Sequence, residues 1–411
     1  MIRNYRSIYR SGVLIAGLIL AVTSCKKEDG TVYKYLVSDE FVTSFKTGYI
    51  NTILGIAEGS YPEISILKPY VTNDIRIYKL VYKTEVDNEN INASGLVCAP
   101  SVAGEYPVIC FQNGTNTMNA YSPSEYPLNP VYQLVEAVSS LGYIVVIPDY
   151  PGFGESARIP HPYLIAEPTV RSITDMLYAV NEFADVGLND VKIKNEYYLM
   201  GYSQGGWATL SLHKSIELDF PDDFNLKGSV CGAGPYNLTL LLNSVSGLTS
   251  YPMPVYIGYI INAYSHYHQF TNPVTDILKE PFASKLTSLY NGLLSSGEIN
   301  SQLTTTVADL FTPGFLTGFQ TGVQYSPVRD ALEANSITAW ATGVPLYLLH
   351  GDADQDVNPV TTENIYDAMI SAGTSTQVIR KEILPGLDHG AGVVPCMVKG
   401  MMFIRALQGL P

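Results

Sequence analysis

The chain has 411 residues, a hydrophobic fraction of 46% and a formal net charge of −14 at pH 7. A chain of this length can bury a large core, so we expect one large domain with an insertion, or two domains. No basic block occurs beyond the N-terminal arginines, which argues against nucleic acid as a partner.

The first 24 residues are typical of an export signal. Three arginines precede an apolar stretch at 13–22 that is short for a bilayer-spanning helix. The stretch ends in Val-Thr-Ser-Cys, which resembles a bacterial lipobox, and the resemblance implies cleavage before Cys25 and lipid on its thiol. An ordinary signal peptide with an incidental cysteine is the alternative. We therefore expect residues 1–24 to be a lipoprotein signal peptide, and the mature protein to be exported and anchored by lipid at the periplasmic face or the cell surface.

After a tether and helical lead-in expected at 25–70, strand-like and helical runs alternate. The strand-like runs lie at 75–84, 91–98, 107–111, 143–147, 196–200, 226–231, 345–350 and 376–384. The helical runs lie at about 131–140, 170–184, 204–216, 361–372 and 392–407. Such alternation predicts an α/β fold with a mostly parallel central sheet and helices on both faces. We expect 71–231 and 344–411 to form the two parts of this core.

The segment 232–343 breaks the alternation. It is rich in Tyr, Leu, Ser and Thr and is punctuated by prolines. A loop of this length without structure of its own is uncommon. We therefore predict a largely helical cap, inserted after the sixth predicted strand.

A Gly-x-Ser-x-Gly motif stands between a short apolar strand and a helical run. Residues 201–206 read Gly-Tyr-Ser-Gln-Gly-Gly. This placement resembles the nucleophile elbow of the α/β-hydrolases, a tight turn that exposes the serine Oγ. Small residues around the serine let strand and helix pass without a Cβ clash. Ser203 is the predicted nucleophile; the alternative is a structural turn whose glycines only relieve crowding.

A nucleophilic serine needs a base, and the base needs an acid to orient it. In α/β-hydrolases the chain order is Ser, acid, His. Of the six histidines, only His389 follows the acidic loop at 352–356. It lies on a short turn after the last predicted strand, at the carboxyl edge of the sheet. His389 is therefore the predicted base.

The acidic loop offers Asp352, Asp354 and Asp356 as the third member. The pattern His-Gly-x-x-Asp-x-x-Val at 350–357 resembles the acid loop of the α/β-hydrolases, and the resemblance implies Asp354, with Asp356 in reserve. The carboxylate would accept the Nδ1–H of the histidine and hold its tautomer.

The same loop fits part of a calcium-binding pattern. Oxygen-bearing side chains stand at 352, 354, 356, 358 and 363, in the spacing of such a loop. Val357 replaces the turn glycine, however, and an apolar strand precedes the loop instead of a helix. Calcium stays as an alternative; we predict no metal and no cofactor.

An oxyanion hole needs two N–H donors. One is expected from the backbone of Gln204, directly after the nucleophile, and the other from Thr115 in the loop after the third predicted strand. Gly114 permits close backbone approach there. Relatives carry His-Gly at this place, whereas this chain has Asn113 instead of the histidine.

The sequence Pro-Asp-Tyr-Pro-Gly-Phe-Gly-Glu-Ser at 148–156 is similar to a loop common in the superfamily, and we interpret it as structural. With the elbow, the 112–115 loop and the large cap, the chain resembles bacterial relatives of the secretory lipase family. Prolyl-oligopeptidase-like hydrolases share the core but carry a long β-propeller that this chain lacks.

The resemblance implies a serine esterase or lipase that acts on carboxylic esters through an acyl-enzyme. A peptidase or acyl-peptide hydrolase with the same three residues is the first alternative. A non-catalytic surface protein that binds glycans is the second, since 30 tyrosines also suit sugar stacking. The expected substrate is a small-molecule, lipid or carbohydrate ester, and the oligomeric state stays open.

Two smaller signals do not decide the function. Four cysteines follow Cys25, at positions 98, 110, 231 and 396; they allow three disulfide pairings, and buried free thiols are at least as consistent with their apolar surroundings. His266 and His268 stand two residues apart, with no paired carboxylates nearby, so we expect them to be surface residues and not metal ligands.

Overall fold

The computed structural model describes residues 32–410. The predicted signal peptide and the lipid attachment at Cys25 lie outside these residues. Within the described chain, no helix combines the length and the apolar character needed to cross a membrane.

The core is a single nine-stranded sheet with the strand order β1-β2-β3-β5-β4-β6-β7-β8-β9. The first three strands and β5 pair antiparallel, and the remaining neighbours, from β5 through β4 to β9, pair parallel. The strands are β1 Leu36–Phe45, β2 Ile75–Val86, β3 Glu89–Pro100, β4 Gly104–Gln112, β5 Ile144–Pro148, β6 Val191–Tyr202, β7 Leu226–Gly232, β8 Leu346–Gly351 and β9 Ile379–Leu384.

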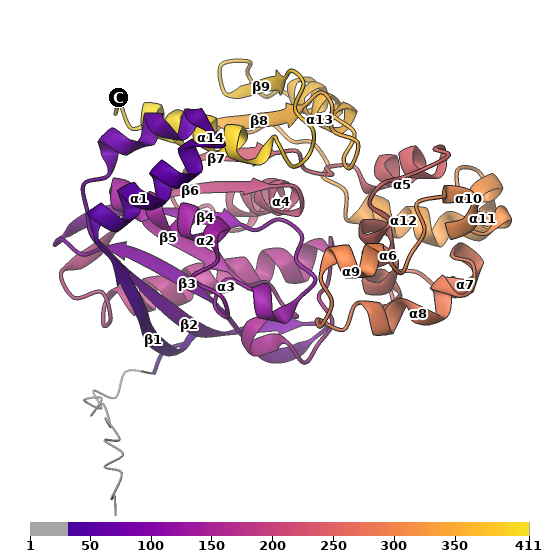
Figure 1. Ribbon diagram of the computed structural model, residues 1–411, viewed down its shortest axis with the longest axis horizontal. Helices are drawn as coiled ribbons and strands as arrows, with labels where there is room; N and C mark the ends of the chain where they lie inside the picture. Colours follow the sequence, from indigo (N-terminus) through magenta and orange to yellow (C-terminus); the bar gives the residue numbers. More distant parts are fainter. Residues whose placement is uncertain (1–31, 411) are drawn as a thin grey trace, which may run out of the picture. The chain divides into compact units, whose positions relative to one another are not determined.

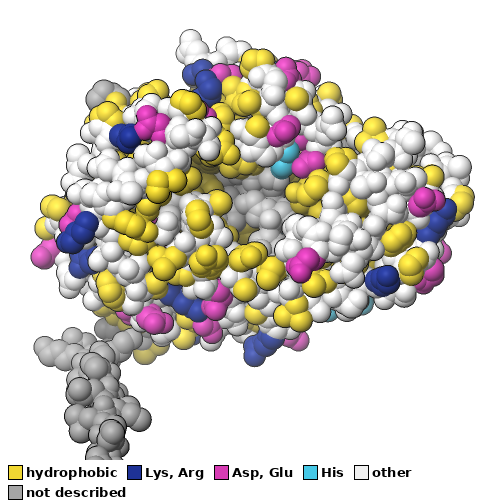
Figure 2. All heavy atoms as spheres, viewed as in Figure 1, with side chains coloured by type: hydrophobic (Ala, Val, Ile, Leu, Met, Phe, Trp, Pro, Cys, Tyr) yellow, Lys and Arg dark blue, Asp and Glu magenta, His cyan; other side chains and the backbone are white. Residues whose placement is uncertain are grey.

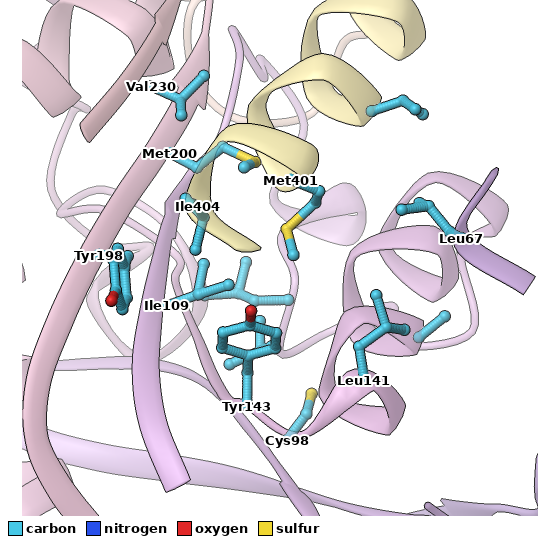
Figure 3. Close-up of a cluster of buried hydrophobic side chains, with 14 of the residues drawn as sticks. Leu67, Cys98, Ile109, Leu141, Tyr143, Tyr198, Met200, Val230, Met401 and Ile404 are labelled. Atoms are coloured by element: carbon cyan, nitrogen blue, oxygen red, sulfur yellow. The ribbon is translucent and has the colours of Figure 1, made fainter. Parts of the chain in front are cut away.

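Helices cover both faces of the sheet (Figure 1). They are α1 Thr47–Glu58, α2 Pro130–Glu136, α3 Ala166–Ala184, α4 Gln204–Asp219, α13 Val360–Ser371 and α14 Val393–Leu407, with the short 3₁₀ helices η1 Pro62–Tyr70, η2 Asn119–Tyr121, η3 Ala137–Leu141 and η4 Gly154–Ser156. Side chains alternate between the two faces along each strand, so Val230 joins the cluster under α14 and η1, whereas Cys231 joins the cluster under α4 and α13. Figure 3 shows the first cluster, where Met401 and Ile404 of α14 pack onto Ile109 and Met200 of the sheet.

The regular elements of the segment between β7 and β8 are all helices, and they cover about half of its residues. Its elements are α5 Leu238–Ser246, α6 Pro254–His266, α7 Val274–Ile277, α8 Phe282–Leu289, α9 Ser296–Asn300, α10 Val307–Leu310, α11 Pro313–Gly318, η5 Val323–Tyr325 and α12 Ser326–Ala334. Figure 1 shows these helices gathered at one side of the sheet. The chain thus leaves the core after β7 and returns to it at the adjacent strand β8.

The predicted α/β-hydrolase architecture is confirmed. One element differs from expectation: the lead-in expected to be helical begins with β1, which pairs with β2 at the edge of the sheet. Most residues of this edge strand are half-buried or exposed, so its apolar pattern is too weak to identify a strand. The insertion therefore follows the seventh strand, which is the sixth of those predicted.

The four described cysteines are buried free thiols. The disulfide alternative therefore does not apply to the described residues. His266 and His268 are both solvent-exposed.

Candidate active site

The predicted nucleophile lies in a sharp turn between β6 and α4. Ser203 has φ 59° and ψ −125°, a left-handed conformation that is costly for a residue with a Cβ. Its backbone N–H donates to the Gly232 carbonyl at 2.9 Å, so the neighbouring strand holds the turn in place. Ser203 thereby stands at the N-terminal end of α4, with its hydroxyl facing His389.

Two glycines of the motif are required by close backbone approach. A Cβ on Gly205 would lie 2.0 Å from the Gln112 carbonyl oxygen, and a Cβ on Gly201 would lie 2.3 Å from the Gly205 carbonyl oxygen. Real Cβ atoms do not approach backbone this closely, so the start of α4 touches the end of β4 only because position 205 has no side chain. The motif thereby brings the nucleophile beside the loop that follows β4.

The structure brings Ser203, His389 and Asp354 into one hydrogen-bonded relay. The Ser203 hydroxyl lies 2.8 Å from His389 Nε2, and His389 Nδ1 lies 2.6 Å from Asp354 Oδ2. A carboxylate only accepts, so Nδ1 carries the proton and Nε2 is free to accept from the serine. The His389 side chain is 11% exposed and that of Asp354 is fully buried.

The carboxylate of Asp354 is held on both oxygens. Oδ1 accepts the backbone N–H groups of Asp356 and Val357, each at 2.9 Å, and Oδ2 also accepts from His350 Nε2 at 3.1 Å. Burial alone would raise the pKa of Asp354, but the hydrogen bonds from His350 and His389 outweigh it and hold that pKa well below its usual value. The acid is therefore ionised across the neutral range.

The other two aspartates of the loop have different surroundings. Asp352 Oδ1 accepts the Gly386 N–H at 2.6 Å and ties the acid loop to the turn before His389. Asp356 contributes its backbone to the loop, and burial raises the pKa of its carboxyl. The carboxylates of Asp352 and Asp354 thus accept from N–H donors, and the described residues contain no group of three His, Cys, Asp or Glu side chains arranged to hold a metal ion. This geometry does not support the calcium-loop alternative.

The loop after β4 lies against the nucleophile. A Cβ on Gly114, which is solvent-exposed, would be 4.0 Å from the Ser203 Cβ. The Asn113 side-chain amide donates to the Pro148 carbonyl at 2.6 Å, and the Asn113 backbone carbonyl accepts from the Tyr150 hydroxyl at 3.1 Å. Asn113 is therefore buried and links the end of β4 to the 148–156 loop. Its side-chain N–H is used in this link and is not a donor in the site.

Gln204 and Thr115, the two expected oxyanion residues, flank the serine. The N–H of Gln204 is at the first turn of α4, where backbone donors have no partner within the helix. The Thr115 hydroxyl lies 2.8 Å from the Tyr163 hydroxyl. Tyr163 stacks in turn on Tyr259 of α6, with ring centroids 4.4 Å apart, so the loop after β4 contacts the insertion through two aromatic rings.

A buried histidine fixes the side chain of Gln204. His161 Nδ1 lies 2.7 Å from the Pro151 carbonyl, which only accepts, so Nδ1 is protonated and Nε2 accepts from Gln204 Nε2 at 2.8 Å. Burial lowers the pKa of His161 to about 4, and the ring stays neutral. The 148–156 loop therefore supports the residue that follows the nucleophile, in agreement with its structural interpretation.

The relay lies at the side of the sheet that the insertion approaches. The insertion contacts the core on both flanks of the relay: the Tyr251 hydroxyl donates to the Asp356 carbonyl at 2.9 Å, and the Thr117 hydroxyl donates to the Leu294 carbonyl at 2.8 Å. Figure 2 shows a deep hollow between the core and the insertion, with hydrophobic side chains around its rim and histidine and acidic side chains at its upper edge. A cavity of about 1030 Å³ between α3 and α4 includes no residue of the relay.

Three supporting residues were not predicted. His350 stands in the acid-loop pattern itself, but it was interpreted only as the end of a strand. His161 has no local motif, and its link to Gln204 appears only in three dimensions. Tyr202, whose hydroxyl donates to the His389 carbonyl at 2.7 Å, stands at one of the two variable positions of the Gly-x-Ser-x-Gly motif, where its identity carries no signal.

The sheet order, the elbow and the position of the insertion define an α/β-hydrolase. A sequence profile of the secretory lipase family matches residues 131–400, and the chain belongs to that family. It is therefore a carboxylic-ester hydrolase, as the resemblance predicted.

Solved structures agree on the fold. A hydrolase from Legionella pneumophila is 26% identical with a TM-score of 0.82, over 91% of this chain and 98% of that chain. The rice cell wall degrading esterase LipA from Xanthomonas oryzae is 22% identical with a TM-score of 0.78, over 90% and 97%. Candida antarctica lipase A in its closed state is 16% identical with a TM-score of 0.65, over 92% and 83%. A comparison with curated proteins found no match.

Proposed function

We propose that the chain is a serine esterase or lipase whose catalytic triad is Ser203, His389 and Asp354. The observation that carries the proposal is the continuous relay from the serine hydroxyl through the imidazole to a buried, ionised carboxylate. Three residues distant in the sequence meet at hydrogen-bond distances, in the order and geometry that nucleophilic catalysis requires.

In this mechanism, His389 Nε2 takes the Ser203 proton as Oγ attacks the ester carbonyl. The imidazolium then gives the proton to the leaving alcohol, and water cleaves the acyl-enzyme with His389 again as base. Asp354 stays ionised and holds the imidazole in the tautomer that accepts from serine. No cofactor takes part in these steps.

The backbone N–H groups of Gln204 and Thr115 are the proposed donors to the tetrahedral oxyanion. Gly114, which is exposed and lies within van der Waals range of Ser203, and the start of α4 beside Ser203 support this assignment. The dipole of α4 adds positive potential where the negative charge develops.

The insertion at 232–343 is the proposed cap that shapes the acyl pocket, because it contacts the acid loop through the Tyr251 hydroxyl and borders the hollow in Figure 2. Membership of a secretory family supports export of the protein. Cleavage of residues 1–24 and lipid attachment at Cys25 stay proposals that rest on the sequence alone. A Cys25→Ser variant that still fractionates with membranes would contradict the lipid anchor.

A fluorophosphonate probe tests the nucleophile directly. The wild-type protein should be labelled at Ser203, and the Ser203→Ala variant should be neither labelled nor active. His389→Ala should be labelled far more slowly, whereas the matched variant His266→Ala, at an exposed histidine of α6, should behave as wild type. Absence of labelling in a folded wild-type protein would favour the glycan-binding alternative.

The substrate class needs a panel of compounds. Short-chain and long-chain p-nitrophenyl esters, compared with aminoacyl-nitroanilides, distinguish an esterase, a lipase and a peptidase. We expect hydrolysis of esters to dominate. Preference for the anilides, abolished by Ser203→Ala, would keep the triad but replace the proposed substrate by an amide.

A further inference from the structure

The carboxylate of Asp354 contacts two histidines, and only His389 reaches the serine. The second, His350, ends β8 and is completely buried. Its Nε2 lies 3.1 Å from Asp354 Oδ2 and 2.9 Å from the Val357 carbonyl oxygen, and its Nδ1 lies 2.7 Å from the Thr362 hydroxyl on α13.

These partners determine how His350 Nε2 bonds. Both groups that face Nε2 are acceptors, so Nε2 must carry a hydrogen. The Thr362 hydroxyl holds the other ring nitrogen, Nδ1. The acid-loop pattern at 350–357 thereby acquires a physical meaning: its histidine bridges the side chain of Asp354 and the backbone of Val357.

We propose that His350 is a positioning residue for the reaction, which fixes the Asp354 carboxylate and shares its Oδ2 with His389. This inference rests on the proposed triad. The two backbone N–H groups on Oδ1 fix one end of the carboxylate, and His350 fixes the other. Without it, Oδ2 would bond His389 alone, and only the backbone N–H groups on Oδ1 would hold the carboxylate independently of that imidazole.

Sharing Oδ2 also sets how strongly the carboxylate stabilises the protonated form of His389. The His350 N–H directs a positive dipole end at the same oxygen, so its removal leaves more negative potential for the imidazolium. Other titratable groups face the relay as well, from several elements: Asp356, Asp388, Tyr202 of β6, Tyr251 and Tyr256 beside the acid loop, and Cys396 of α14. All of them are unchanged in the variants below, so a difference between variants reports His350.

The test compares three variants in the full-length protein on a soluble short-chain p-nitrophenyl ester. His350→Leu fills the site without a donor, His350→Gln places an amide N–H near the position of Nε2, and Thr362→Val removes the hydroxyl that holds Nδ1 of His350. For His350→Leu we expect kcat to fall about ten- to a hundredfold, the loss of one charge-assisted hydrogen bond, with little change in KM. The acid limb of its kcat/KM–pH profile should move to higher pH. His350→Gln should recover most of the rate.

A matched control separates positioning from packing. His213 of α4 is also fully buried, and its Nε2 contacts a carboxylate (Glu217, 3.2 Å) and a threonine hydroxyl (Thr342, 3.1 Å), but it has no contact with the relay. His213→Leu should lower thermal stability without moving the pH profile. A His350→Leu variant with the wild-type kcat and profile would overturn the inference, and so would equal loss in the Leu and Gln variants.

If His350→Leu does not fold, the Thr362→Val variant tests the role of His350 instead. The proposal requires a lower kcat at unchanged KM for that variant, and the wild-type kcat would refute it. Ser203→Ala keeps the two levels of inference apart. Residual activity in Ser203→Ala removes the proposed function, whereas an inactive Ser203→Ala with an unaffected His350→Leu removes only the role of His350.

Discussion

Replacing Asp354 by Asn removes the charge and puts hydrogens where the structure requires lone pairs. Four N–H donors point at the carboxylate, two at each oxygen. An amide has one oxygen, so either the backbone of the acid loop or the two histidines must face an NH₂ group. If the oxygen stays with the backbone, His389 can pair with the amide only by accepting through Nδ1.

In that tautomer Nε2 carries the hydrogen and cannot take the proton of Ser203. The expected loss in kcat is on the order of 10⁴-fold, as for other wrong-tautomer triads, which corresponds to about 5 kcal/mol in the activation barrier. The donors left unpaired add a stability cost of about 1–3 kcal/mol each. Initial rates on a short-chain p-nitrophenyl ester and a thermal melt measure the two effects separately.

Asp356→Asn is the matched control, because Asp356 serves the loop through its backbone N–H and carbonyl. It should lose less than about tenfold in kcat, since it perturbs only the field around His389. A larger loss in Asp356→Asn than in Asp354→Asn would move the acid to position 356. A folded Asp354→Asn variant that keeps most of its activity would refute the relay itself.

The depressed pKa of Asp354 adds a pH dependence with a defined sign. Because the carboxyl is more acidic in the folded protein than in the unfolded chain, its contribution to stability is present above the unfolded pKa, about 4, and is lost as the pH falls below it. The difference in unfolding free energy between wild type and Asp354→Asn should therefore shrink below about pH 4. Chemical denaturation at neutral and acidic pH measures it.

Three further predictions concern packing, burial and metals. Gly205→Ala places a Cβ against backbone carbonyls, so it should lower the free energy of unfolding by about 3 kcal/mol and remove most of the activity. The control is Gly48→Ala in α1, which has open space around it and should stabilise the protein by about 0.5–1 kcal/mol. Equal melting temperatures for the two variants would contradict the close approach at position 205. The Glu136 carboxyl is buried without a hydrogen-bond partner among the described residues, and burial raises its pKa to about 8. The free energy of unfolding should therefore fall as the pH rises from about 4.5 towards 8, by up to about 5 kcal/mol. Glu136→Gln should be the more stable protein at pH 9 and similar to wild type at pH 4, which denaturant titrations at the two pH values check. EDTA should leave ester hydrolysis unchanged, and a loss that calcium restores would revive the calcium-loop alternative.

The parts of the fold that are buried on both sides were the most predictable from the sequence. The strand at 143–147 is an unbroken apolar run because both faces of β5 are covered, and eight of the nine strands of the sheet have a predicted counterpart. The edge strand β1 gave no such pattern. The helices of the insertion were predicted only as a group, because they are short and begin at prolines and serines that also punctuate loops.

The site was predictable where its residues carry an order along the chain. Ser203, the acid loop and His389 occur along the chain in the order Ser, acid, His that is typical of α/β-hydrolases. That order alone was enough to nominate them. The supporting contacts follow no periodic pattern and join residues that are far apart in the sequence. His161 bonds Gln204, 43 positions away, and Tyr202 bonds His389, 187 positions away. His350 is the exception, since its spacing from Asp354 is local and an inspection of the motif for partners of the acid could have found it.

The insertion leaves the sheet at the end of one strand and rejoins it at the start of the strand beside it. Its length can therefore change without altering the register of either strand, and all three residues of the relay lie outside 232–343. Under the proposed roles of the relay and the cap, reaction chemistry and substrate choice occupy separable stretches of one gene. Exchange of this stretch between homologues, cut at those two junctions, is the natural route to altered specificity on an unchanged catalytic frame.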